Sequence, residues 1–136
     1  MQTFLPYPDF ARSAACLDSR RLGKQRIEAR QILTILTDPT RRGWRHHPAV
    51  EMWRGYEDAL RLYMNAMITE WTRRGHRNTM PLAQVMGEAK LPPWLGDPAF
   101  HASHRANLLR KDPTFYSRYG WTESPDLPYV WPGVSA

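Results

Sequence analysis

Apolar residues recur at spacings of three and four in two stretches of the chain, which is typical of amphipathic helices. The clearest stretch follows His47-Pro48, with Glu57 as its one polar interruption. Its apolar positions are Val50, Trp53, Leu60, Met64, Met67 and Trp71. This pattern predicts one long helix that begins at Pro48, buries that face and ends near Gly75, a suitable C-cap.

Two helices are predicted before that one. Asp9 can cap a short helix through Ala15, and Asp18 or Ser19 can cap a longer one to about Thr37. The longer helix carries Leu22, Ala29, Leu33 and Leu36 near one face. A glycine inside it, Gly23, weakens the pattern by about 1 kcal/mol relative to alanine. The helix should stop at Asp38-Pro39, because proline restricts the residue before it.

A third main helix is predicted after Asp97-Pro98, with aspartate as N-cap and proline in the first turn. It should run to about Lys111 and stop before Pro113. Thr79–Pro93 can hold a short helix, and the tail Phe115–Ala136 is rich in aromatic residues and proline without a convincing period. With no strand alternation and no repeat, the sequence predicts an all-α fold: a single compact domain, 1–136, of three main helices with this tail.

The length and composition are typical of one small domain. The chain has 136 residues and a single cysteine, Cys16, so no intrachain disulfide can form. No apolar run approaches the ~20 residues of a membrane span, and no signal-peptide pattern opens the chain. We expect a cytoplasmic monomer with no membrane partner.

The charge balance narrows the class of partner. Lys and Arg total 19 against 13 acidic residues, for a net charge of +6 and a sequence pI of about 9.9. Such a pI is the usual footprint of nucleic-acid binding, although basic proteins also avoid aggregation in this way. Arginine dominates, with lysine only at positions 24, 90 and 111. Its planar guanidinium matches phosphate oxygens, which favours a nucleic-acid partner.

The densest basic segment lies in the predicted helix 19–37: Arg20, Arg21, Lys24, Arg26 and Arg30. On a helix, Arg21 and Glu28 share a face with Lys24 or Gln25 between them. The cations favour phosphate binding, and Glu28 among them can act as a stabilising carboxylate. The alternative is a solvated helix face held by ion pairs.

Histidines form the next candidates. His47, beside Trp44 and Arg45 at a predicted helix start, can contact phosphate, bind metal or serve only as a cap. His101 and His104 lie one helical turn apart, next to Arg105. With His47 they could complete a three-histidine metal site. No cysteine or carboxylate stands at ligand spacing, so a polar active-site role or a structural role is favoured and no metal is expected.

The aromatic tail can stack on bases. Phe115, Tyr116, Tyr119 and Trp121 are interleaved with Arg118, and base stacking contributes about 1–3 kcal/mol per base. The alternative is that these rings cover the helical core. Tyr116 and Trp121 are the candidates for contact with DNA.

His101–Gly120 resembles the C-terminal helix and aromatic signature (Trp-Tyr-x-x-Tyr-Gly) of phage-type pyrimidine-dimer DNA glycosylases, the endonuclease V family. The order of helices is also similar. Met1–Phe10, Leu22–Arg26 and His47-Pro48 are similar to a divergent bacterial subgroup related to that family. Only residues 20–28 and 101–121 are specific, and the identity is low.

The resemblance implies an all-α DNA glycosylase with coupled abasic-site lyase activity and no metal or other cofactor. It implies that a terminal α-amine is the nucleophile, normally that of a threonine exposed by removal of methionine, assisted by a glutamate on the first helix. Here Gln2 should prevent that removal, so the amine would belong to Met1, and Thr3 stands one position too far along the chain. Gln25 aligns with the family's glutamate, and Glu28 follows one turn later.

The first hypothesis is therefore a glycosylase or lyase acting on a damaged or modified base in double-stranded DNA, associated with the nucleoid. Gln25 and Glu28 would face the extruded nucleotide, and the Met1 amine would be the nucleophile. His47, His101 and His104 would line the pocket. The predicted DNA contacts are Arg20, Arg21, Lys24, Arg26, Arg45, His101, His104, Arg105, Tyr116 and Trp121. The alternatives are a non-catalytic DNA-binding module on the same scaffold, or a nucleotide or glycoside hydrolase that uses Glu28 and the histidines.

Overall fold

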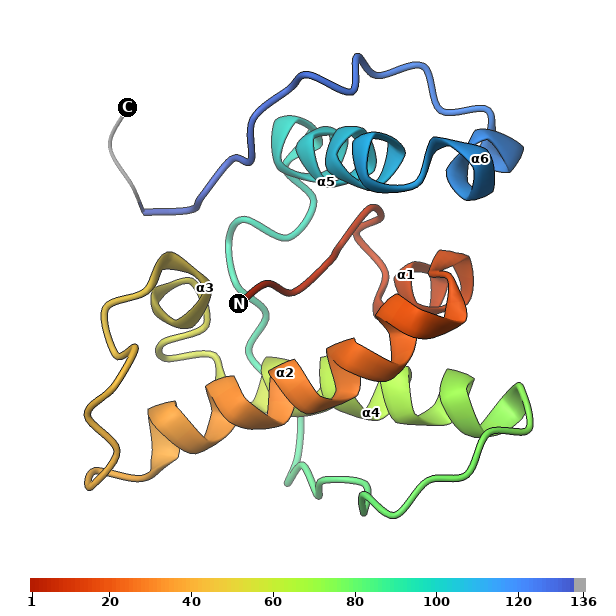
Figure 1. Ribbon diagram of the computed structural model, residues 1–136. Coiled ribbons are helices and arrows are strands. Elements are labelled where there is room, and N and C mark those ends of the chain that lie inside the picture. The colour runs from red at the N-terminus through yellow and green to blue at the C-terminus, as the bar shows by residue number, and fades with distance from the viewer. Residues whose placement is uncertain (134–136) are drawn as a thin grey trace.

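The computed structural model describes residues 1–133, and this part of the chain contains six α-helices, one 3₁₀ turn and no strand (Figure 1). The predicted all-α class is confirmed. In order, the elements are α1 (Phe10–Cys16), α2 (Ser19–Thr37), α3 (Pro48–Glu51), α4 (Glu57–Arg73), α5 (Pro98–Lys111), α6 (Pro113–Tyr116) and η1 (Ser117–Tyr119). The three long ones are α2, α4 and α5. Within residues 1–133, no helix is long and apolar enough to cross a membrane.

Aspartate caps set most of the helix starts that the sequence predicts. The Asp9 carboxylate accepts the Arg12 N–H at the start of α1, and Asp18, rather than Ser19, accepts the Arg21 N–H at the start of α2. Asp97 caps α5 with Pro98 in the first turn. Each cap satisfies a backbone donor that has no partner within the helix. These predictions are confirmed, with α1 ending at Cys16 rather than at Ala15.

The predicted long helix from Pro48 to Gly75 is wrong, because it is two helices. His47 caps the four-residue α3 through Nδ1, which accepts the Ala49 N–H at 3.0 Å. Gly55 then turns the chain at a φ of +85°, a left-handed conformation that favours glycine. Glu57, the polar interruption of the pattern, is the first residue of α4, where a negative charge suits the helix dipole. The predicted C-terminal end of this helix is confirmed, because Gly75 follows the C-cap of α4 at a φ of +89°.

Two other expectations also need correction. Thr79–Pro93 contains no helix, and the Asn65 side chain holds this stretch by bonding both the N–H and the carbonyl of Ala83, at 2.8 and 2.9 Å. The tail is not free of helix, because the Asp112 carboxylate accepts the Phe115 N–H and starts α6. The last residues of the predicted tail, 134–136, lie outside the described residues.

Helices α2 and α4 run side by side and form the base of the molecule in Figure 1. Their close approach depends on Gly23, because a Cβ there would lie only 2.8 Å from Cζ3 of Trp71. The glycine that weakened the sequence pattern is therefore needed for packing. Leu22 and Ala29 are fully buried, as predicted. Ile32 and Ile35 are buried more deeply than Leu33 and Leu36, which pack at the edge of the core.

An extended N-terminal segment, Gln2–Pro6, passes between α5 and the α2–α4 pair (Figure 1). It is not part of a sheet, so side chains must satisfy its backbone polar groups. On the α5 side, the Leu5 N–H donates to His104 Nδ1 at 2.8 Å, and the Leu5 carbonyl lies 2.7 Å from His101 Nδ1. Arg105 donates to the Pro6 carbonyl at 2.7 Å. These three residues of α5 fix the course of the segment.

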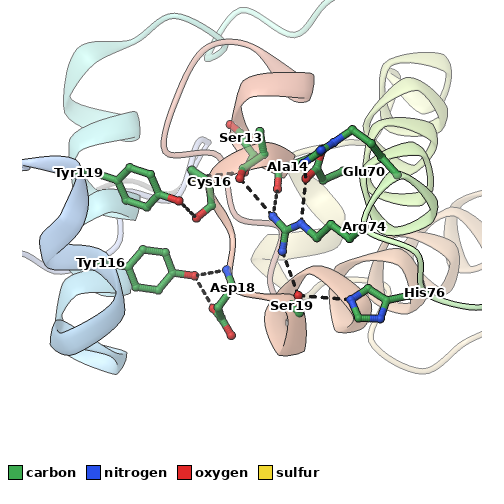
Figure 2. Close-up of polar contacts among 12 residues, drawn as sticks. Ser13, Ala14, Cys16, Asp18, Ser19, Glu70, Arg74, His76, Tyr116 and Tyr119 are labelled. Carbon is green, nitrogen blue, oxygen red and sulfur yellow. Dashed lines mark hydrogen bonds and ion pairs between the residues drawn. The ribbon is translucent and has the colours of Figure 1, made fainter.

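A second polar network joins α1 and the following turn to α4 and the tail (Figure 2). The Arg74 guanidinium pairs with Glu70 at 2.8 Å and donates to the carbonyl of Ala15 at 3.1 Å. Across the turn, the Tyr116 hydroxyl donates to the Asp18 carboxylate, and the Tyr119 hydroxyl donates to the Cys16 carbonyl at 2.8 Å. The C-terminal aromatic residues are thus bonded to the turn that starts α2.

Stability should fall below pH 6.5 because His104 is buried as a neutral acceptor. Burial first, and then the charge of His101, lower the pKa of His104 from the ordinary 6.5 to about 3. Between these pH values the unfolded chain binds a proton that the folded chain does not. The contribution of His104 to the free energy of unfolding should therefore be complete above pH 6.5. It should fall by roughly 1.4 kcal/mol per pH unit as the pH drops toward 3.

Urea unfolding at several pH values between 7 and 4 measures that slope. His104→Asn keeps an acceptor for the Leu5 N–H but does not titrate, so its slope should be shallower by about one proton. His46→Asn, at an exposed histidine, is the matched control. An unchanged slope in His104→Asn would show that another group controls the acid sensitivity.

Candidate active site

The N-terminal segment Gln2–Pro6 holds the residue before it, Met1, at the side of α2. The Gln2 N–H donates to Glu28 Oε2 at 3.1 Å, which sets Met1 beside that carboxylate. Gln25 Nε2 donates to the Gln2 carbonyl at 2.9 Å and to Glu28 Oε2 at 3.1 Å. Met1 is therefore brought next to a carboxylate and a buried amide of α2.

Gln25 has the fuller set of internal bonds. Its side chain is 2% exposed, and its Oε1 accepts the Phe4 N–H at 2.8 Å and the Tyr63 hydroxyl at 2.6 Å. Its amide nitrogen already donates to Gln2 and Glu28. The role is one that glutamine suits, because a single side chain must both donate and accept. Gln25 thus holds the segment, while Glu28 remains partly exposed next to Met1.

Two open grooves meet at Met1 and Glu28, since both residues line each of them. The basic groove, of about 350 Å³, is further lined by Gln2, Phe4, Arg20, Arg21, Lys24, Gln25 and Lys111. The second groove, of about 370 Å³, is further lined by Arg30, Gln31, Thr34, Ile35, Arg41 and Trp44. We call this second one the Trp44 groove. Met1 therefore lies at their junction.

His47 lies near this junction but lines neither groove. Burial first, and then the positive charge at the start of the chain, lower the pKa of His47 below its ordinary 6.5. Its ring packs edge-on between Trp44 and Trp131, with centroids 5.8 and 6.1 Å away. Because Nδ1 caps α3, only Nε2 is left for another partner.

The predicted cations divide into two groups. Arg20, Arg21 and Lys24 line the basic groove together, and Arg21 also pairs with Asp18 at 3.2 Å. The structure does not bring Arg26 and Arg45 to the basic groove. Arg26 donates to Asn78 at 2.7 Å and lies 4.4 Å above the Trp71 ring. Arg45 donates to the carbonyls of Ile35 and Arg41, near the end of α2.

The candidates of α5 and the tail are buried or half-buried and bonded within the protein. His101 and His104 are each 2% exposed and bond the N-terminal segment, and Tyr116 is fully buried. Arg105 also pairs with Glu123 at 2.5 Å. The Trp121 ring stacks on Tyr116 and Tyr119, and its Nε1 donates to the Tyr7 hydroxyl at 2.9 Å. None of these five lines either groove.

Nine groove residues were not among the predicted site residues: Gln2, Phe4, Arg30, Gln31, Thr34, Ile35, Arg41, Trp44 and Lys111. Arg41 and Trp44 lie in a segment whose basic character was visible in the sequence, and Arg30 belongs to the basic run of α2. Lys111 had no local signal, because only folding brings the end of α5 to the start of α2. Among residues 1–133, no cluster of three histidine, cysteine or acidic side chains is arranged to hold a metal ion.

Comparison with known proteins gives one finding. A family model described as pyrimidine dimer DNA glycosylase matches residues 1–84, which is more than half of the chain and includes Met1, the whole of α2 and Trp44. No curated protein and no solved structure matches the chain.

Gln25→Glu should destabilise the fold at neutral pH. The new carboxylate cannot donate to the Gln2 carbonyl, and it would lie against Glu28 in a buried position. We expect a loss of about 2–4 kcal/mol in the free energy of unfolding at pH 7. The pKa of that carboxyl should be raised in the folded state, so the deficit relative to wild type should shrink as the pH falls toward 4.

Urea unfolding at pH 7 and at pH 5 tests this prediction. Gln31→Glu makes the same chemical change at an exposed position of α2 and should cost little. Equal stability of Gln25→Glu and Gln31→Glu at pH 7 would contradict the role given to the Gln25 amide.

Proposed function

The chain belongs to the pyrimidine dimer DNA glycosylase family, and on that premise we propose that it removes a damaged or modified base from double-stranded DNA and then cleaves the strand at the abasic site. The observation that carries the proposal is the position of the first residue. Met1 lies beside Glu28, at the junction of two grooves, and the bond from Gln2 to Glu28 keeps it there.

The basic groove supports DNA as the substrate. Arg20, Arg21, Lys24 and Lys111 gather at its walls, and the net charge of +6 favours a polyanion over the whole surface. Cations that neutralise successive phosphates release bound counterions, which drives association and makes it dependent on salt. Along this groove the sugar-phosphate backbone can pass close to Met1.

The chemistry follows from an amine beside a carboxylate. The neutral Met1 amine attacks C1′ of the nucleotide, forming an N–C1′ bond while the bond from C1′ to the base breaks and the base leaves with a proton. Opening of the sugar ring gives an imine between the amine and C1′. The imine acidifies the C2′–H, and loss of that proton with cleavage of the C3′–O bond breaks the strand by β-elimination. Water then releases the amine.

Glu28 is the group placed to assist. Its carboxylate can stabilise the positive charge that develops on the sugar and can take the proton that the amine loses on attack. Gln25 cannot do either, and its amide is already engaged with the N-terminal segment. Thr3 is also engaged, because its hydroxyl accepts the Trp53 indole N–H at 3.1 Å and the residue is fully buried. We therefore assign the nucleophile to Met1 and the assisting carboxylate to Glu28.

Borohydride trapping tests the amine mechanism. Protein carrying its affinity tag at the C-terminus is incubated with duplexes that hold an abasic site or a pyrimidine dimer, with and without borohydride. We expect strand cleavage without it and a permanent cross-link with it, since borohydride reduces the imine. Peptide mapping should place the cross-link on Met1 rather than on Lys24 or Lys111, and a Gly-Ser extension ahead of Met1 should abolish it.

Tight binding that weakens steeply with salt, with no cross-link and no cleavage, would instead favour a non-catalytic DNA-binding module. Weak DNA binding that does not respond to salt would favour a hydrolase of nucleotides or small glycosides. Mapping of the cross-link to a lysine would retain the activity but remove Met1 from the mechanism.

Glu28→Gln should separate catalysis from binding. The amide can still accept the Gln2 N–H, so the segment stays in place, but it carries no charge and takes no proton. We expect turnover of a cleaved substrate to fall by about 100-fold or more, in the range for loss of a general acid–base group, with DNA affinity changed little. The matched control is Glu51→Gln, at an exposed carboxylate that lines neither groove. Single-turnover kinetics measure the effect on catalysis, and equilibrium binding measures the effect on DNA affinity. Unchanged turnover would remove Glu28 from the mechanism.

A further inference from the structure

Helix α4 and the stretch that follows it enclose an apolar groove that takes no part in the proposed reaction. The groove has a volume of about 410 Å³. Its apolar surface comes from Ile68 and Met80, which are buried, and from Leu82, which is 57% exposed. It shares no residue with the basic groove or the Trp44 groove. The stretch after α4 runs along the lower edge of Figure 1, whereas the N-terminal segment lies above α2. The other residues that line the groove are Thr69, Thr72, Arg73 and Asn78.

Two of the polar side chains in this groove already have partners inside the protein. The Thr72 hydroxyl donates to the Ile68 carbonyl at 2.9 Å. The Asn78 side chain accepts the Arg26 guanidinium at 2.7 Å and donates to the Met80 carbonyl at 2.7 Å. Groups that are engaged in this way gain little from a new polar partner. The groove is therefore suited to an apolar side chain, whose removal from water is favourable.

The rim of the groove is positively charged. The Arg73 side chain is 68% exposed and bonds Glu70 through Nε and Nη2, and within residues 1–133 its Nη1 has no partner. Arg77 is exposed and precedes Asn78, to which Arg26 is bonded. None of the seven residues that line the groove is acidic. An occupant that carries negative charge beside an apolar side chain would therefore complement both the groove and its rim.

The size and charge of the groove decide among the possible occupants. A stable interface between folded proteins takes about 20–30 residues on each side, whereas seven residues line this groove. A second copy of the chain would bring the same net charge of +6 to a positive rim. DNA phosphates would be drawn to the rim but could not fill an apolar groove. A short acidic peptide with an apolar residue meets all of these conditions.

We propose that this groove binds an acidic peptide segment of another protein, with one apolar side chain in the groove and a neighbouring carboxylate on Arg73. The apolar side chain supplies most of the affinity, and the charges set the orientation of the peptide and speed its association. A partner bound here leaves the basic groove open. The proposal goes beyond the proposed function and does not depend on it, because neither Met1 nor Glu28 takes part.

Fluorescence anisotropy with synthetic peptides tests this proposal. The probe is a labelled peptide of four aspartates followed by leucine and phenylalanine. In one comparison peptide serines replace the two apolar residues, and in the other lysines replace the aspartates. The probe should bind at least about 10-fold more tightly than either, in line with burial of one large apolar side chain.

Two variants at the groove should weaken binding of the probe. Leu82→Ser removes apolar surface from the edge of the groove and should weaken binding by about 5-fold or more. Arg73→Gln should weaken binding and reduce its dependence on salt, because it removes the charge that faces the peptide. Glu70 keeps Arg74 as its partner in that variant, so the fold should not change.

Leu91→Ser is the matched control, because Leu91 is 55% exposed on the same stretch but does not line this groove. It should bind the probe as the wild type does. Equal binding of the three peptides, or full binding by Leu82→Ser, would overturn the proposal. Displacement of the probe by an undamaged duplex, with loss of binding in Lys24→Gln, would place the peptide in the basic groove instead. Self-association in sedimentation that Leu82→Ser abolishes would assign the groove to a second copy of the chain.

Discussion

A buried extended segment without a neighbouring strand is the constraint on which the rest of this structure depends. Each backbone N–H and carbonyl in such a segment needs a partner, because an unpaired polar group in the interior costs as much as a lost hydrogen bond. Here the partners are side chains: Gln25 and Tyr63 bond Phe4, and His101 and His104 bond Leu5. Long helices from three parts of the chain thus converge on the same few residues.

This arrangement couples the core to the candidate active site. The contacts that pack the segment between α5 and the α2–α4 pair also determine where its first residue emerges, at the side of Glu28. A residue near a chain terminus would otherwise be free to move, since termini are mobile unless they are tied down. In the proposed mechanism, buried residues such as His104 and Tyr63 would therefore act on function by positioning Met1. Effects of these residues on activity and on stability should be correlated.

Charge is distributed so that each groove has a different character around the same amine. Gln25, which the resemblance aligned with an acidic residue, is a buried neutral group with a donor and an acceptor in use. The carboxylate stands one turn further along α2, where it is partly exposed and lines both grooves. Four arginine and lysine side chains line the basic groove, whereas an exposed indole and two arginines line the Trp44 groove. One turn of α2 therefore separates Gln25, which stabilises the fold, from Glu28, to which the proposed mechanism assigns the chemistry.

The sequence by itself determined the helices whose ends carry local signals. Asp9, Asp18 and Asp97 act on backbone donors within three residues, so their caps could be read directly, as could the basic run of α2. The break before Glu57 was missed, because Val50 and Trp53 remain buried on the same core and the apolar pattern passes through the turn unchanged. Only the tertiary structure decided which candidates meet. It turned His101 and His104 inward, sent Arg26 to Trp71, brought Lys111 to α2 and exposed Trp44 beside Met1. Those outcomes depend on contacts between residues up to about a hundred positions apart, and local propensity carries no information about such contacts.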